Sequence, residues 1–159
     1  MKKILKVDMD GCIAVWNEKA SFEEVAEEGY FRNRIPQTNL LEALKILMKK
    51  GIDIRICSAA YQDGHSEADK RYWLKKHFIE LPEEAIEIVP YGTKKPGGEN
   101  VFLIDDYTKN LKEFEGIGIK FLNQINNNSF GSWDGYVISY TQSAKSLANQ
   151  IEAIMIMEG

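Results

Sequence analysis

The sequence predicts an α/β fold in which a mostly parallel sheet of five strands is covered by helices on both faces. Two observations predict it: short apolar runs alternate with segments of helical periodicity, and polar residues suited to chemistry lie beside the ends of these runs. Strands that alternate with helices form right-handed βαβ units, which build a doubly wound, three-layer sandwich. We expect residues 1–159 to form one such domain, because the length suits a single core.

Five apolar runs are the expected strands of the sheet. They span residues 3–8, 52–57, 86–89, 101–104 and 117–122. Their length, of four to six residues, and their bounding turn residues are typical of strands. Residues 136–139 are a further candidate, for a short edge strand.

The expected helices begin at recognisable capping residues. Capping-box spacing occurs at Ser21–Glu24, opening a short helix to about residue 28, and again at Ser66–Asp69. Thr38 can cap the helix between these two, and a last helix begins near Thr141. Residues 15–36 fit no βα unit, so we expect them to form a small, reduced cap segment inserted into the domain.

The composition excludes several classes of protein. The net charge of −4 gives no electrostatic surface for stable nucleic-acid binding, so an anionic substrate needs a local positive site. The first apolar run is too short for a signal peptide, and no run approaches membrane-spanning length. Cys12 and Cys57 form no CxxC pair and are interpreted as reduced, buried thiols. We expect a cytoplasmic monomer or homodimer that does not bind membranes.

Asp8 and Asp10 lie two residues apart where the first strand ends. Residues i and i+2 of a strand point the same way, so both carboxylates can enter one pocket, and Gly11 lets the backbone approach a ligand closely. Burying like charges is costly unless a cation or a phosphoryl-transfer site accompanies them. The alternative is an Asp-rich turn without chemistry.

Three later segments can be brought beside this pair. Asp105 and Asp106 follow an apolar strand, and hard oxygen ligands of this kind suit Mg²⁺, although a helix N-cap is the alternative. Ser58 ends the second strand and can hold phosphate oxygens, and Lys94 or Lys95 can neutralise them; each could equally be a solvated surface residue. Ligands of parallel sheets bind at the carboxyl ends of the strands, where these segments converge.

Taken in order, these motifs resemble the haloacid dehalogenase-like (HAD) phosphohydrolase superfamily, which has a Rossmann-like fold. The residues that carry the resemblance are Asp8-Met9-Asp10-Gly11, Ser58, Lys95 and Asp105-Asp106. A closer resemblance is to the 5′(3′)-deoxyribonucleotidases, the family of the cytosolic type C 5′-nucleotidases. It rests on Asp8-Met9-Asp10-Gly11, the Ile56-Cys57-Ser58 strand end, the segment Asp69–Phe78 and the strand end Leu103–Asp106.

The resemblance implies a Mg²⁺-dependent phosphomonoesterase, with a nucleotide as the expected small-molecule substrate. Asp8 would attack phosphorus to form an aspartyl-phosphate, and Asp10 would act as general acid and then as general base. The implied catalytic residues are Asp8, Asp10, Ser58 and Lys95; the implied metal-binding residues are Asp8, Asp10, Asp105 and Asp106, with Asp106 the direct ligand of the last pair. The implied substrate-binding residues are Gly11, Trp16, Ser58, Ala59 and Lys95, with Trp16 where the family places a base-stacking aromatic residue.

The sequence also departs from the family. Ala59 follows Ser58 where the nucleotidases carry a second hydroxyl, Thr93 stands where an arginine is expected, and the segment at 15–36 is much shorter than the usual cap. Alternatives therefore stay open: a phosphatase for another small or polymeric phosphate, a signalling domain phosphorylated on aspartate, or a catalytically silent binding domain.

Overall fold

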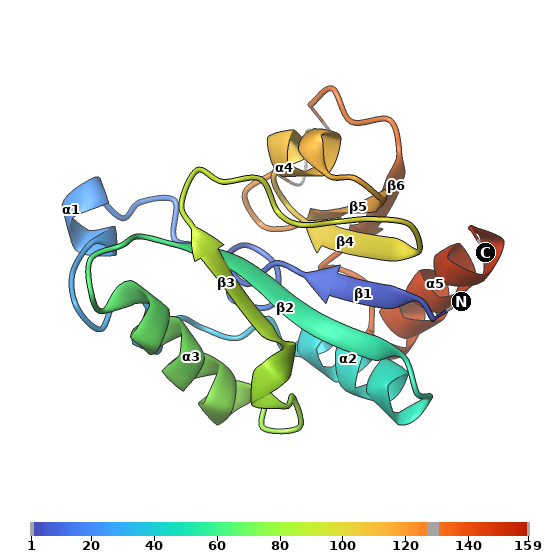
Figure 1. Cartoon of the computed structure of the whole chain (residues 1–159), viewed down its shortest axis with the longest axis horizontal. Coiled ribbons are helices and arrows are strands. Elements are labelled where there is room, and N and C mark those ends of the chain that lie inside the picture. Colours follow the sequence, from blue (N-terminus) through green and yellow to red (C-terminus); the bar gives the residue numbers. More distant parts are fainter. Residues whose placement is uncertain (1, 127–130, 159) are drawn as a thin grey trace.

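The sheet has six strands, and every neighbouring pair is parallel, in the order β3-β2-β1-β4-β5-β6 (Figure 1). The structure is a computed structural model that describes residues 2–126 and 131–158. The strands are β1 Ile4–Val7, β2 Asp53–Ala60, β3 Ile86–Pro90, β4 Val101–Asp105, β5 Ile117–Leu122 and β6 Tyr136–Ser139. The α/β class is thus confirmed, and the count of five is wrong because β6, foreseen as a candidate edge strand, pairs in full register with β5.

The helices begin close to the predicted positions, and the cap predicted at Ser21 is confirmed, whereas those predicted at Thr38 and Ser66 are wrong. They are α1 Phe22–Val25, α2 Thr38–Lys49, α3 Ser66–His77, α4 Thr108–Glu113 and α5 Ala144–Met157, with short 3-10 helices η1 Phe31–Asn33 and η2 Glu83–Ala85. Ser21 caps α1 as predicted, accepting the Glu24 N–H at 3.1 Å, although α1 is shorter than expected. The capping box predicted for α3 is wrong: Asp63 accepts the Ser66 N–H at 2.8 Å.

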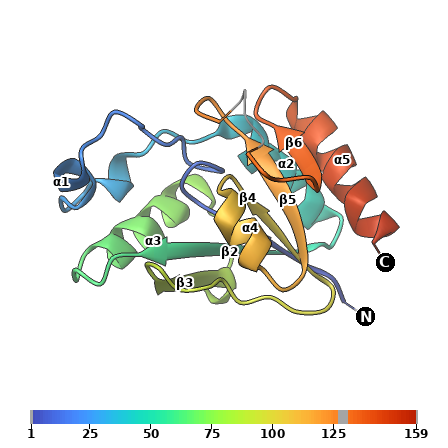
Figure 2. The same cartoon turned by 90° about the horizontal axis from the view of Figure 1, so that it is seen from above.

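Helices cover the two faces of the sheet unequally (Figures 1 and 2). The main core lies on the face covered by α2, α3 and α5, and includes Leu5, Leu44, Trp73, Phe102 and Leu147. On the other face, α4 covers β4 and β5 over a small cluster that includes Leu103, Leu111 and Phe114. Residues 91–100, all of them described, connect β3 to β4 without a helix. Within the two described ranges, no helix combines the length and apolarity needed to cross a bilayer.

The strand order brings the predicted motifs together. After β1 the chain adds β2 and β3 on one side, and then β4, β5 and β6 on the other. Val7 pairs in register with Ile56 of β2 and with Ile104 of β4, so the carboxyl ends of these three strands are neighbours. This switch point is where open parallel sheets bind ligands.

Residues 15–36 extend beyond the carboxyl ends of the strands, with α1 at the far end (Figure 1). Asp69, on the buried face of α3, attaches this segment to the domain. It accepts the Gly29 backbone N–H at 2.7 Å and pairs with Arg32 Nε at 2.9 Å, and it is only 3% exposed. A carboxylate predicted to cap a helix therefore anchors the inserted segment instead.

We expect Asp69→Ala to loosen this segment and destabilise the protein by about 2 kcal/mol, since a buried donor loses its partner. Urea unfolding measures the loss, and cleavage by a glutamate-specific protease after Glu27 or Glu28 should accelerate. Glu67→Ala, on the exposed face of α3, is the matched control and should leave both measurements near wild type. Unchanged protease resistance in Asp69→Ala would contradict the anchoring role.

Candidate active site

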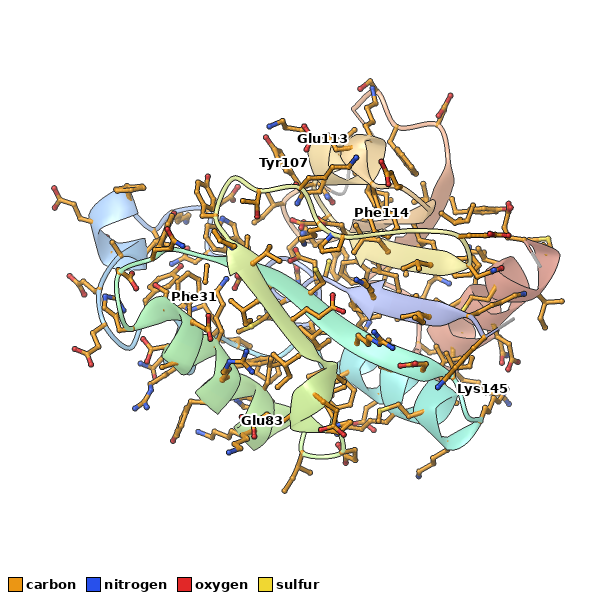
Figure 3. The ribbon with its side chains drawn as sticks, viewed as in Figure 1. Phe31, Glu83, Tyr107, Glu113, Phe114 and Lys145 are labelled. Atoms are coloured by element: carbon orange, nitrogen blue, oxygen red, sulfur yellow. The ribbon has the colours of Figure 1, made fainter. Side chains whose placement is uncertain are left out.

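A pocket of about 260 Å³ opens at the carboxyl ends of the central strands. Figure 3 shows Phe31 beside α3 and Tyr107 beside α4, and both side chains line this pocket. Most of the site residues predicted from the sequence lie on its wall, namely Asp8, Asp10, Trp16, Ser58, Ala59, Lys95 and Asp106. Gly11 and Asp105 are not among its lining residues and lie behind it.

Lys95 bridges two buried carboxylates at the bottom of the pocket. Its Nζ lies 2.8 Å from Asp8 Oδ1 and 2.7 Å from Asp105 Oδ2. Asp105 is held from behind, because it accepts the Tyr107 N–H at 2.9 Å and the Asn110 amide at 3.1 Å. The Lys95 side chain is 3% exposed, so this ion network is largely removed from water. Burial alone lowers the pKa of Lys95, but the two carboxylates raise it above its usual value, which keeps the ammonium charged.

Asp10 faces a second buried cation, Lys70 of α3. Lys70 Nζ lies 2.7 Å from Asp10 Oδ2 and 3.0 Å from Ser58 Oγ, and it also donates to the Ala59 carbonyl. Its position is fixed further by the Phe31 ring, whose centroid is 4.4 Å away. The other oxygen of Asp10, Oδ1, is buried and has no hydrogen-bond partner among the described residues. Asp10 therefore keeps one oxygen available for a proton on a bound molecule.

The sequence interpretation missed Lys70, although a signal for it exists. Lys70 precedes Trp73 by three residues and Leu74 by four, so it lies on the same helical face as two apolar residues. All three side chains are buried in α3. A lysine on the buried face of a helix needs a buried counter-charge, and here that charge is Asp10.

Asp106 lies against the turn that follows β1. Gly11 has φ of 86°, and a Cβ atom built on it would overlap the Asp106 carboxylate, so only glycine permits this approach. Asn123 binds both parts, donating to the Gly11 carbonyl at 2.9 Å and to Asp106 Oδ2 at 3.3 Å. Asn123 was not singled out from the sequence; it begins an Asn-rich stretch whose residues 127 and 128 lie outside the described ranges.

The carboxylates at the bottom of the pocket carry more negative charge than the described cations beside them balance. Burial, then the charge of Asp105, raises the pKa of Asp8 to about 7, even though Lys95 acts in the opposite direction. Burial and the charges of Asp8 and Asp105 also raise the pKa of Asp106 well above its usual value. Both carboxylates therefore resist ionisation, and a cation bound between them would stabilise the ionised form of each.

The donor atoms at this point fit Mg²⁺. Oxygens of Asp8 and Asp106 and the sulfur of Cys12 lie within 4.8 Å of one another. Burial and nearby carboxylates raise the pKa of the Cys12 thiol, so it stays protonated and the carboxylate oxygens are the effective donors. A site with few carboxylates and an open position suits Mg²⁺, because this hard cation keeps several of its bound waters. Cys12 and Cys57 are both free and buried, as expected.

Aromatic side chains form the upper wall of the pocket. Trp16 packs edge-on against Tyr30 of the inserted segment, at 6.4 Å between ring centroids. On the wall from β2 and β3, Tyr61 packs against Tyr91 at 4.9 Å and against Phe22 at 5.9 Å. Thus both charged groups and aromatic rings line the pocket.

Comparison with known protein families identifies the family of the chain. The family model described as 5′ nucleotidase, deoxy (pyrimidine), cytosolic type C protein matches residues 15–134. The chain belongs to this family. It is therefore a nucleotidase-type hydrolase of the HAD superfamily, as its motifs predicted. The match includes Trp16, Ser58, Lys95 and the Asp105–Asp106 pair, and it begins after the Asp8–Gly11 turn. A search of curated proteins found no match to the chain.

We expect Asp106→Asn to stabilise the metal-free protein, and more so at pH 8 than at pH 5. Burial, then the charges of Asp8 and Asp105, raises the pKa of Asp106 well above its ordinary 3.8, so the folded state binds more protons than the unfolded state above pH 3.8 and loses stability as pH rises. Removing the ionisable group of Asp106 relieves that loss, by about 1 kcal/mol at pH 8.

Urea unfolding in EDTA at the two pH values measures this difference. Asp134→Asn, at an exposed position, removes an equal charge and should unfold like wild type at both. An equal gain for Asp106→Asn at pH 5 and pH 8 would show that carboxylate repulsion is not its cause.

Proposed function

We propose that the protein is a Mg²⁺-dependent phosphomonoesterase that hydrolyses nucleoside monophosphates through an aspartyl-phosphate on Asp8. The observation that carries the proposal is the pairing of two differently held aspartates in one pocket. Asp8 is fixed by Lys95 and lies beside Asp106, whereas Asp10 keeps a buried oxygen without a partner among the described residues. Such a pair suits a nucleophile and a separate proton-transfer group.

The first half-reaction forms the bond between an Asp8 carboxylate oxygen and phosphorus. The ester bond from phosphorus to the alcohol oxygen breaks, and that oxygen leaves with the electron pair and takes a proton from Asp10. Lys95 and Ser58 hold the phosphoryl oxygens, and Lys70 keeps Asp10 oriented through the 2.7 Å ion pair.

In the second half-reaction, Asp10 takes a proton from a water molecule, whose oxygen attacks phosphorus. The bond between phosphorus and Asp8 breaks, which releases inorganic phosphate and restores the Asp8 carboxylate. Asp10 thus returns to its starting protonated state, and atoms and charges balance over the cycle.

Asp8 and Asp106 would hold Mg²⁺ directly, with Asp10 and Asp105 completing its negative surroundings. When bound, the ion would neutralise the clustered carboxylates and polarise a phosphoryl oxygen. Without such a cation, the raised pKa of Asp8 would leave much of the nucleophile protonated near neutral pH.

The proposed substrate is a nucleotide because both charged groups and aromatic rings line the pocket. Residues 15–36 would act as the reduced cap of a single domain spanning 1–159, and Trp16 would stack on the base. Ala59 would line the phosphate end of the pocket, and Gly11 would act indirectly, by letting the Asp106 carboxylate approach. The cytosolic type named in the family description supports a cytoplasmic location for this chain.

A phosphatase for another small or polymeric phosphate is the nearest alternative, because the cap is short. A signalling domain phosphorylated on aspartate is disfavoured by Asp10, since a group two residues past the nucleophile promotes hydrolysis of the phosphoryl bond that such a domain must keep. A silent binding domain would not require the buried proton-transfer group.

Purified protein should release phosphate from nucleoside 5′- or 3′-monophosphates in the presence of Mg²⁺, and Asp8→Asn should lower the rate at least 10³-fold by removing the nucleophile. The panel should include sugar phosphates and phosphoglycolate, with EDTA as the metal-free arm. Asp134→Asn is the matched surface control and should keep wild-type rates. Full activity in Asp8→Asn, or no turnover on any substrate, would refute the proposal.

Trp16→Ala should raise KM for nucleotides about tenfold while changing KM for a generic aryl phosphate much less, because base stacking is worth about 1–3 kcal/mol. Steady-state kinetics on both substrates measure the difference. Equal effects on both would mean that Trp16 supports the cap and does not contact the base.

A further inference from the structure

The loop that carries Lys95 has no helix to hold it. Residues 91–100 run from β3 to β4 on the sheet face opposite the main core, and all ten are described as loop or turn. Lys95 must nevertheless be fixed accurately, because its single ammonium group contacts both Asp8 and Asp105. The question is which groups hold its main chain in place.

Two sets of contacts hold the main chain that follows Lys95. Gly97 packs so closely on the backbone of Glu115 that a Cβ atom would overlap it, and the Gly98 N–H donates to the Glu115 carbonyl. From the sheet, Lys6 Nζ donates to the Pro96 carbonyl at 2.9 Å. Lys6 therefore binds the peptide unit between Pro96 and Gly97, the second peptide unit after Lys95.

Lys6 is an unusual residue for its position. It lies in β1 between paired strands β2 and β4, and its side chain is only 7% exposed. Its charge is balanced by Glu87 of β3, whose Oε2 lies 2.7 Å away. Glu87 is itself near Arg55, at 3.7 Å. Lys6 does not line the catalytic pocket, so neither substrate nor metal accounts for it.

The alternation of the strand explains how Lys6 reaches the loop. Lys6 and Asp8 are two residues apart in and just after β1, so they point toward the same face of the sheet. Lys95 and Pro96 are consecutive in the loop above that face. Lys95 contacts Asp8 while the next residue contacts Lys6, so the loop is attached to β1 at two successive points.

We propose that Lys6 is a positioning residue for catalysis: it holds the Pro96 carbonyl and thereby keeps the Lys95 ammonium on Asp8 and Asp105. Glu87 serves as the counter-ion that orients Lys6. This inference rests on the proposed function, in which Asp8 is the nucleophile. Loss of the Lys6 contact lets the Lys95 main chain shift, and displacements of about 1 Å at a reacting group cost up to a hundredfold in rate.

The kinetic test uses Lys6→Met, which keeps the aliphatic side chain and removes the donor. We expect kcat to fall roughly ten- to a hundredfold, with KM for the substrate changed less than threefold and with recovery toward wild type in Lys6→Arg. Lys94→Met, an exposed lysine of the same loop, is the matched control and should keep wild-type kcat. An unchanged kcat in Lys6→Met would overturn the proposal.

A double mutant separates positioning from general destabilisation. If Lys6 acts through Lys95, adding Lys6→Met to Lys95→Met should lower kcat no further, because the group it positions is already absent. A double variant whose decrease in kcat equals the product of the two single-variant decreases would overturn the proposal. If Lys6→Met does not fold, Glu87→Gln is tested in its place. Its decrease in kcat should be smaller and should likewise be non-additive with that of Lys95→Met.

A second readout does not depend on activity. Acetylation of Lys95 by a mild amine-reactive reagent, followed by mass spectrometry, should be several-fold faster in Lys6→Met than in wild type, with Lys94 as the internal reference. An inactive wild-type protein would refute the proposed function while leaving this test intact. Equal Lys95 labelling in both proteins would refute the role of Lys6.

Discussion

The central constraint on this protein is the clustering of three carboxylates at one strand end: buried Asp8 and Asp105, which contact the Lys95 ammonium, and half-buried Asp106 beside Asp8. One cation does not balance three carboxylates, and burial together with their mutual repulsion raises the pKa values of Asp8 and Asp106. The surrounding architecture follows from holding these groups together: the switch point aligns the strand ends, and Gly11 lets Asp106 approach. In the proposed mechanism, this imbalance favours the binding of Mg²⁺ and accommodates the charge that moves during phosphoryl transfer.

The two aspartates after β1 are distinguished by their cations. Lys95 reaches Asp8 from the β3–β4 loop, and Lys70 reaches Asp10 from α3. Both lysines belong to segments that make other structural contacts. Helix α3 anchors the inserted segment through Asp69, and the β3–β4 loop is bound by Lys6. The proposed nucleophile and the proposed proton-transfer group therefore depend on opposite sides of the sheet for their orientation.

Local sequence signals predicted the strand ends and their chemistry, because hydrophobic runs and the residues after them are contiguous in the chain. They could not predict contacts made across the fold. Asp69 has the spacing of a capping residue, and only the packing of the inserted segment on α3 shows it binding Gly29 and Arg32. In the sequence, Lys6 is an ordinary strand residue, and only the fold shows that it contacts the β3–β4 loop. For a related reason, the sequence could not establish whether residues 136–139 form a strand, since four residues carry little periodicity. Their pairing with β5 shows that they do.

The most direct test of the central claim is chemical trapping of the phosphorylated enzyme. Protein mixed with substrate and Mg²⁺ is quenched during turnover and treated with borohydride, which reduces an acyl phosphate to an alcohol. Peptide mass spectrometry should then find homoserine in place of aspartate at position 8 only. Reduction at Asp10, or at no aspartate while phosphate is being released at steady state, would contradict the assignment of Asp8 as the nucleophile.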